Sequence, residues 1–242
     1  MKNKIYRILL LSLVFAMGNS IFAEAKPLPD FNAGSMNWGT QRYKFTLIKN
    51  GKKIELGSAI IRNELKDDRV ILTDEYLVRY KGKPMSLNMK LVCRKDQYLS
   101  PLKIECKGKG SDEMPTFKAI IKDGDAKISG EWNKTMKIPK GTVTSAAFLR
   151  IVSQLPRVQG ATFRYDFALE AGEMHLKGDY IAKVIGKETI FCDGEPVKCW
   201  KISQNGGGIS EQLFWVNEDG ILQRVLQDGR KQIDLQKGEP GD

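Results

Sequence analysis

The sequence predicts a mainly β protein: a single highly curved antiparallel sheet, an open or half barrel, with one short helix packed in its concave side. Three observations support this class. Apolar and polar residues alternate with a period of two over most of the chain, which is the pattern of half-buried strands. Turns marked by Gly and Pro recur at short intervals. One segment, about residues 144–155, carries a helical pattern instead.

The strand pattern begins at Tyr43, where Tyr43, Phe45 and Leu47 share one face. Asn50-Gly51 follows and favours a tight hairpin turn, because type I′ turns need a positive φ at both central residues. The same alternation returns between turns along the rest of the chain. Further strands are expected at 54–61, 70–80, 86–95, 102–107, 116–122, 126–132, 163–169, 174–185, 189–192, 197–203, 209–217, 222–226 and 231–235.

The helical segment has recognisable ends. Thr144 or Ser145 can cap its N-terminus, and Pro156 stops it. Its apolar stripe is broad and must be covered by protein, most simply by the concave side of the sheet. The residues of the stripe are Ala147, Phe148, Ile151, Val152 and Leu155.

The N-terminus has the features of a secretory signal peptide. Lys2, Lys4 and Arg7 precede an apolar run over 8–17, and Ala23-Glu24-Ala25 fits a cleavage site after Ala25. A membrane-spanning helix needs about twenty apolar residues, about twice this run, so residues 1–25 are expected to be removed and to leave no transmembrane anchor. No cysteine lies near the cleavage site, so a lipoprotein is not expected. The mature protein is predicted to be soluble in the periplasm or secreted by Gram-negative-type export.

The mature chain is predicted to form one domain. Residues 26–40 are rich in Pro, Gly and Asn and are expected to be a loosely ordered leader. Residues 41–237 form the single β-rich domain, because no Pro-rich linker divides them. Residues 238–242 are expected to fray.

The four cysteines are Cys93, Cys106, Cys192 and Cys199. An even number in an oxidising compartment favours disulfides, and three pairings are possible. Cys93–Cys106 and Cys192–Cys199 each flank a polar turn, and opposite residues of a hairpin come close enough to form a bridge, so these pairs are expected. Zinc binding would need closer spacing and more histidine, and a redox-active pair is normally Cys-x-x-Cys.

Three pieces of the C-terminal part carry a resemblance. They are Ser153-Gln154-Leu155-Pro156 with the aromatic strand at 163–167, then 184–190 leading into 195–202, and last 213–220. On these pieces, residues 138–235 resemble a bacterial family of exported proteins of unknown function, which is similar to the half-barrel group containing the lipoprotein carrier proteins. The resemblance implies a strongly curved sheet whose hollow is partly filled by the helix. It implies no catalytic residue.

Charge and residue types limit the possible functions. The net charge of +10 becomes about +8 after removal of residues 1–25, which favours attraction to anionic surfaces. Basic residues are interspersed with acidic ones, so no nucleic acid is expected as a partner. His175 is the only histidine and no Gly-x-Ser-x-Gly motif occurs, so no catalytic residue, metal or cofactor is predicted. A pair of carboxylates for hydrolysis stays open, because distances are invisible in the sequence.

Aromatic and aliphatic residues at alternate positions suggest a binding hollow. They can simply pack beneath the helix, or line a space for an acyl chain or another apolar ligand. The candidate lining residues are Phe148, Phe163, Tyr165, Phe167, Trp200, Ile202 and Phe214.

Three functions follow. The first is a carrier of a hydrophobic ligand or lipoprotein segment, the second an envelope scaffold that binds a protein or an anionic polymer, and the third a carboxylate-dependent hydrolase. A large apolar cavity favours the first, and a filled core with exposed apolar residues favours the second.

Overall fold

The computed structural model describes residues 24–80, 82–110 and 115–236. Nearly all of the predicted signal peptide and the predicted frayed tail at 238–242 lie outside these residues. The strands are β1 Lys26–Pro27, β2 Gly39–Lys49, β3 Lys52–Lys66, β4 Arg69–Tyr80, β5 Lys83–Arg94, β6 Pro101–Lys109, β7 Thr116–Lys122, β8 Asp125–Gly130, β9 Lys134–Lys137, β10 Thr142–Thr144, β11 Thr162–Glu170, β12 His175–Cys192, β13 Glu195–Gly206, β14 Ile209–Asn217, β15 Leu222–Gln227 and β16 Lys231–Leu235.

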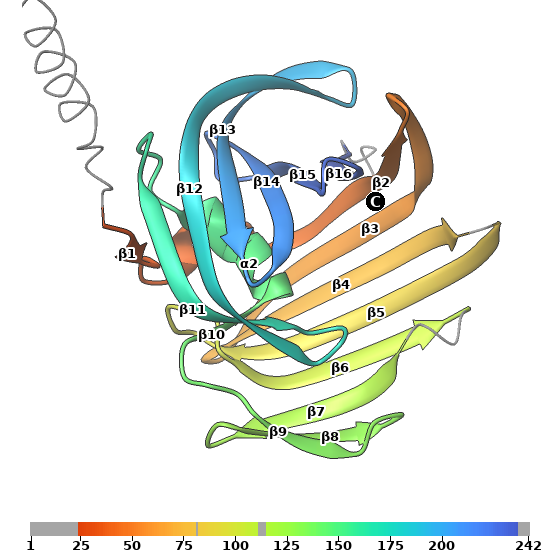
Figure 1. The fold of residues 1–242 in the computed structure, drawn as a ribbon, viewed down its shortest axis with the longest axis vertical. Coiled ribbons are helices and arrows are strands. Elements are labelled where there is room, and N and C mark those ends of the chain that lie inside the picture. Colours follow the sequence, from red (N-terminus) through yellow and green to blue (C-terminus); the bar gives the residue numbers. More distant parts are fainter. Residues whose placement is uncertain (1–23, 81, 111–114, 237–242) are drawn as a thin grey trace, which may run out of the picture.

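All of these strands belong to one open sheet, which confirms the predicted fold class (Figure 1). Its order is β1-β11-β12-β13-β14-β15-β16-β2-β3-β4-β5-β6-β7-β8-β9, and β10 also pairs with β11. Neighbouring strands are antiparallel except β1 and β10, which run parallel to β11. The sheet is therefore mixed in these two short strands and antiparallel elsewhere.

The two halves of the sheet meet at a single seam. The last strand, β16, pairs with the first long strand, β2, so that Lys231 lies opposite Leu47 and Leu235 opposite Tyr43. Strands β11–β16 thus form one half and β2–β9 the other (Figure 1).

Bulges bend the sheet, because an extra residue on one strand kinks it and increases its twist. They occur where β2 pairs with β3, β5 with β6, β12 with β13, β13 with β14, and β14 with β15. Gly206 shows why one of them needs glycine: its φ is +133°, and a Cβ there would lie 1.9 Å from the carbonyl oxygen of Asp179.

The predicted helix forms and lies in the hollow between the two halves (Figure 1). It consists of α2, Ser145–Ile151, followed by the 3-10 turn η2, Val152–Gln154. The Thr144 hydroxyl caps it by accepting a hydrogen bond from the Ala147 N–H at 3.0 Å. Of the described helices, none combines the length and apolarity that a bilayer crossing requires.

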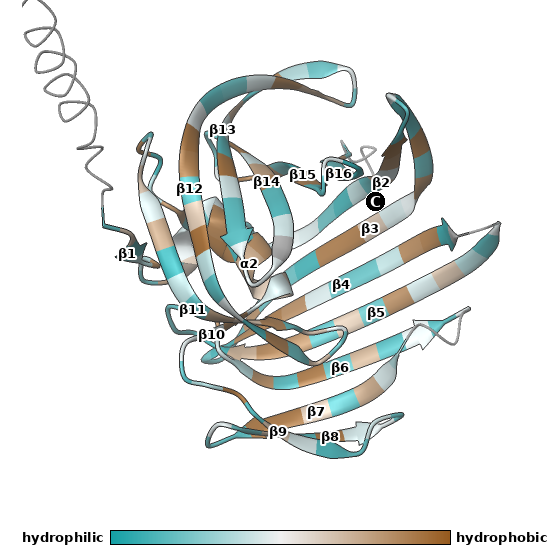
Figure 2. Cartoon of the chain, in the orientation of Figure 1, coloured by the Kyte–Doolittle hydropathy of each residue, from teal (hydrophilic) through white to brown (hydrophobic). Residues whose placement is uncertain are grey.

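Hydrophobic and hydrophilic residues alternate along the strands, as the banding of β4–β7 in Figure 2 shows. Successive side chains of a strand point to opposite faces of the sheet, so one set enters the core. The main core takes residues from both halves of the sheet and from α2. In β12 the bulge between Val184 and Gly186 reverses the alternation, so that even-numbered residues before and after it point to opposite faces of the sheet. Val184 consequently lies in the main core, whereas Ile190 and Cys192 join Trp215 in a small second cluster.

The segment before β2 is anchored, which corrects the prediction of a loosely ordered leader. Its β1 pairs with β11, and the Leu28 side chain is buried in the main core. The Asn32 N–H donates to Gln154 Oε1 at 2.9 Å, at the end of η2. A short 3-10 turn, η1 Ala33–Ser35, follows, and the Trp38 indole N–H donates to the Ala33 carbonyl. The Pro- and Gly-rich composition hides these contacts, because they depend on residues far away in the sequence.

Candidate functional site

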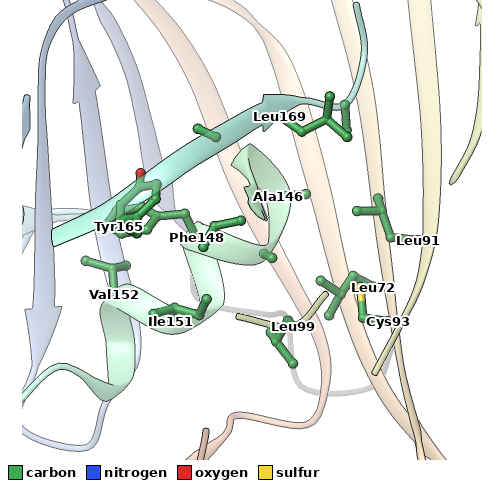
Figure 3. Close-up of a cluster of buried hydrophobic side chains, with 14 of the residues drawn as sticks. Leu72, Leu91, Cys93, Leu99, Ala146, Phe148, Ile151, Val152, Tyr165 and Leu169 are labelled. Carbon is green, nitrogen blue, oxygen red and sulfur yellow. The ribbon is translucent and has the colours of Figure 1, made fainter. Parts of the chain in front are cut away.

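The predicted lining residues gather mainly beneath α2. Phe148 packs its ring 5.3 Å from that of Tyr165 on β11 and 5.5 Å from that of Phe214 on β14. Figure 3 shows Phe148 against Tyr165, with Leu72, Cys93 and Leu99 gathered away from this ring pair. Phe163 and Ile202 are also buried in this core. The helix thus fills the hollow by contacting both halves of the sheet.

Two predicted residues are not among the buried members of this core, although Trp200 packs against it. Phe167 is half-buried and is not part of the main core. Trp200 is half-buried and lines a surface hollow of about 560 Å³ together with Ile185 and Lys187. The Lys187 ammonium lies 5.0 Å from the centre of the indole ring.

Little space remains beside the helix. The cavity bordered by Phe148, Tyr165, Tyr180 and Phe214 has a volume of about 20 Å³. A single water needs about 10–15 Å³ by the same measure, so the cavity is of the size of one water molecule. Polar residues also line it, because Gln204 borders the cavity and its amide donates to the Tyr165 hydroxyl. An acyl chain does not fit there in this structure.

A buried ion pair fixes the other side of the helix. Arg150 on α2 donates from Nη2 to Asp74 Oδ1 on β4 at 2.5 Å, and from Nε to Asn63 Oδ1 on β3 at 2.8 Å. Its third bond goes to the carbonyl of Ala146 at 3.0 Å. The side chains of Arg150 and Asp74 are only 3% and 1% exposed. The Asn63 amide continues the network by donating to the Asn37 carbonyl at 2.8 Å.

The electrostatics of this cluster keep the Arg150 guanidinium charged. Burial alone lowers the pKa of Arg150, but the adjacent Asp74 carboxylate reverses this effect and leaves the pKa raised. Burial also raises the pKa of Tyr43 and of Tyr76, which surround the pair, so both phenols stay neutral. This cluster was not predicted from the sequence. The sequence feature that could have indicated the cluster is Arg150, because it is a lone charged residue within the apolar helical segment.

All four cysteines are buried free thiols, which corrects the prediction of two hairpin disulfides. Cys106 lies opposite Met89, which is four residues from Cys93 on β5. At about 3.3 Å per residue this offset is about 13 Å, whereas a disulfide needs Cα atoms within about 7 Å. The hairpin of β12 and β13 has the same offset, because Cys199 lies opposite Glu188.

The register differs because each turn is centred two residues earlier than expected. The second turn consists of Asp193-Gly194, whose φ values are +51° and +83°. Asp-Gly is typical of type I′ hairpins and was the signal that fixes this register. Burial raises the pKa of Cys93 to about 12 and that of Cys106 to about 11, so these thiols stay protonated and poorly reactive at neutral pH.

A second open groove lies at one end of the sheet. It has a volume of about 510 Å³ and is formed by the β5–β6 turn, the β7–β8 turn and the loop after β9. Charged residues of both signs line it, among them Arg94, Asp96, Asp123 and Lys140. This mixed lining does not select a single class of ligand.

The fold has a counterpart among solved structures. The crystal structure of a beta-barrel-like protein of the domain of unknown function DUF1849 from Brucella abortus is similar, with a TM-score of 0.56 and 11% sequence identity. The alignment covers 88% of this chain and 98% of that chain. No protein-family model matches the chain, and no curated protein matches it either. At this identity the likeness concerns the fold alone.

Proposed function

We propose that this chain is a non-enzymatic binding protein of the cell envelope that holds its partner on its outer surface. One observation carries the proposal: α2 fills the hollow of the sheet and leaves a space of only about 20 Å³ beneath it. A carrier of a hydrophobic ligand needs a hollow that can receive the ligand. A filled core favours the scaffold hypothesis instead.

The residues that are chemically able to take part in catalysis support a non-enzymatic role. Among the buried polar residues of the described part, Asp74 is the one acid, and it is bonded to Arg150. A carboxylate held in this way is not available as a general base. His175 is exposed at the start of β12, opposite Glu170.

Exposed apolar side chains supply contact area outside the core. Leu77, Val158 and Phe191 are 54%, 63% and 66% exposed and lie on separate elements. With the basic character of the chain, they suit a partner that offers apolar and anionic groups.

The proposed compartment is the periplasm or the outside of the cell. The signal-peptide features support it, as does strand β1, which begins at Lys26, directly after the proposed cleavage site. Expression of the full chain in a Gram-negative host, followed by N-terminal sequencing of the periplasmic fraction, tests it. We expect a mature N-terminus at Lys26, and an uncleaved cytoplasmic chain would contradict it.

Native mass spectrometry of protein purified gently from the periplasm tests the choice between scaffold and carrier. We expect the mass of the ligand-free chain and no saturable binding of the apolar dye N-phenyl-1-naphthylamine. The control is Phe148→Ala, which opens a void under the helix and should take up the dye. Stoichiometric lipid that is bound to the wild type and is displaced by the dye would refute the proposal and support a carrier.

A further inference from the structure

The outer face of β5–β8 gathers lysines that are scattered in the sequence. On these strands alternate residues enter the main core, among them Leu91, Ile104, Ala119 and Ile128. The residues between them point away from the core. Seven of these are lysines, and five of the seven we call the lysine face: Lys90, Lys103, Lys107, Lys118 and Lys127.

The strand register places these lysines next to one another. Lys90 and Lys118 both lie opposite Glu105 of the intervening strand. Lys103 and Lys127 both lie opposite Ile120 in the same way. With strands about 4.8 Å apart, the members of each pair are separated by about 10 Å. Lys107 lies four residues from Lys103 on β6, about 13 Å along the strand.

The charge of this face is strongly one-sided. Among the described residues at these paired positions, Glu105 is the acid, and it is bonded to Lys103 at 2.6 Å. The hydrogen bond from Lys103 lowers the pKa of Glu105, and the nearby charges of Lys118 and Lys107 lower it further. Five lysines and one glutamate give the face a net charge of about +4.

The lysines form a two-dimensional grid with apolar side chains inside it. Ile120 is 44% exposed between Lys103 and Lys127, and the half-buried Val92 lies opposite Lys103. A linear polyanion follows one row of charges, whereas a grid matches a plane of charges. Amphipathic helices that lie on a bilayer surface combine lysines with apolar side chains, and this face of the sheet has the same combination.

We infer that the lysine face docks the protein onto the surface of an anionic lipid bilayer. The inference rests on the proposed function, because it names the partner that the outer surface holds. Lysine side chains are long enough to reach the headgroups, and Ile120 can enter the interface between them. Each lysine near such a surface increases membrane partitioning by about five-fold at moderate ionic strength.

Co-sedimentation with vesicles tests this inference. We expect the mature protein to bind vesicles of phosphatidylethanolamine and phosphatidylglycerol but not vesicles of phosphatidylcholine. The triple variant Lys90→Gln, Lys107→Gln, Lys118→Gln should lose about 100-fold in partitioning. The matched control, Lys52→Gln, Lys183→Gln, Lys198→Gln, removes the same charge from exposed lysines of other strands and turns, and should lose less than about five-fold.

A second variant separates a membrane from a soluble polyanion. Ile120→Ser should weaken vesicle binding by about five-fold, because part of an isoleucine side chain leaves the interface, and should leave binding to polyphosphate unchanged. Equal losses in the two triple variants would overturn the inference, as would no vesicle binding by the wild type. Polyphosphate binding as tight as vesicle binding would overturn it too, while leaving the proposed surface-binding function intact.

Discussion

Replacing Arg150 by methionine tests whether the buried ion pair holds α2 in the hollow. The change keeps a side chain of similar length but removes its three hydrogen bonds and leaves the Asp74 carboxylate without its cation. Asp74 Oδ2 already has no hydrogen-bond partner, so no other group compensates the charge. Breaking one side of a buried pair costs about 3–5 kcal/mol. This is a large fraction of the stability of about 5–15 kcal/mol that is usual for a domain.

Urea unfolding followed by tryptophan fluorescence measures the loss as a change in midpoint at constant m value. The matched control is Lys137→Met, which breaks the Lys137–Asp125 pair at the same kind of N–O distance, 2.9 Å. Its side chains are 81% and 39% exposed, so the cost should stay below about 1 kcal/mol. The two variants therefore differ in whether the ion pair that they break is buried or exposed.

The double variant Arg150→Met, Asp74→Leu provides the decisive comparison. It removes both charges, and replacement of a buried pair by apolar residues is often neutral or stabilising. We expect it to recover most of the stability that the single variant loses. A single variant no worse than the Lys137→Met control, or a double variant as unstable as the single one, would refute the reasoning.

Three further predictions use the same urea assay. Phe148→Ala should cost about 3–5 kcal/mol because it empties the site between Tyr165 and Phe214, and a loss below about 1 kcal/mol would contradict the packed hollow. The free energy of unfolding should fall as the pH rises above about 9, because burial raises the pKa of Cys93 from 9.0 to about 12. The stability due to the protonated thiol is fully present below the pKa of Cys93 in the unfolded chain and is lost as the pH rises to its pKa in the folded protein. Cys93→Ala should therefore make the free energy of unfolding depend less steeply on pH. An unchanged pH dependence would contradict this prediction. Gly206→Ala should cost about 2–5 kcal/mol through steric overlap and backbone strain. The control Gly208→Ala should cost about 1–2 kcal/mol, because no atom lies within 4 Å of a Cβ at that position. Equal urea midpoints for the two variants would contradict the close approach of Gly206 to the Asp179 carbonyl.

The strands and the helix could be predicted because their signals are local. Period-two alternation depends only on neighbours along the chain, and Thr144 and Pro156 mark the ends of the helical segment. The placement of that segment in the hollow followed from the width of its apolar stripe. The packing of Phe148 against Phe214 confirms the placement.

Features that depend on register or on distant pairing could not be predicted in the same way. The disulfide prediction was wrong because a shift of two residues in a turn moves the opposite residue by four. The partner of Arg150 is separated from it by 76 positions in the sequence, so the charge alone did not reveal Asp74. The lysine face appears only when the strands are aligned, since its members come from four of them.

The seam between β16 and β2 has a consequence for biogenesis. Because β16 bridges β15 and β2, the sheet cannot be completed until residues 231–235 are available to pair. Until then the exposed backbone edges of β15 and β2 can pair with other chains. Loss of residues 231–242 by a premature stop codon removes few atoms, yet it leaves both edges permanently open and favours aggregation over native assembly.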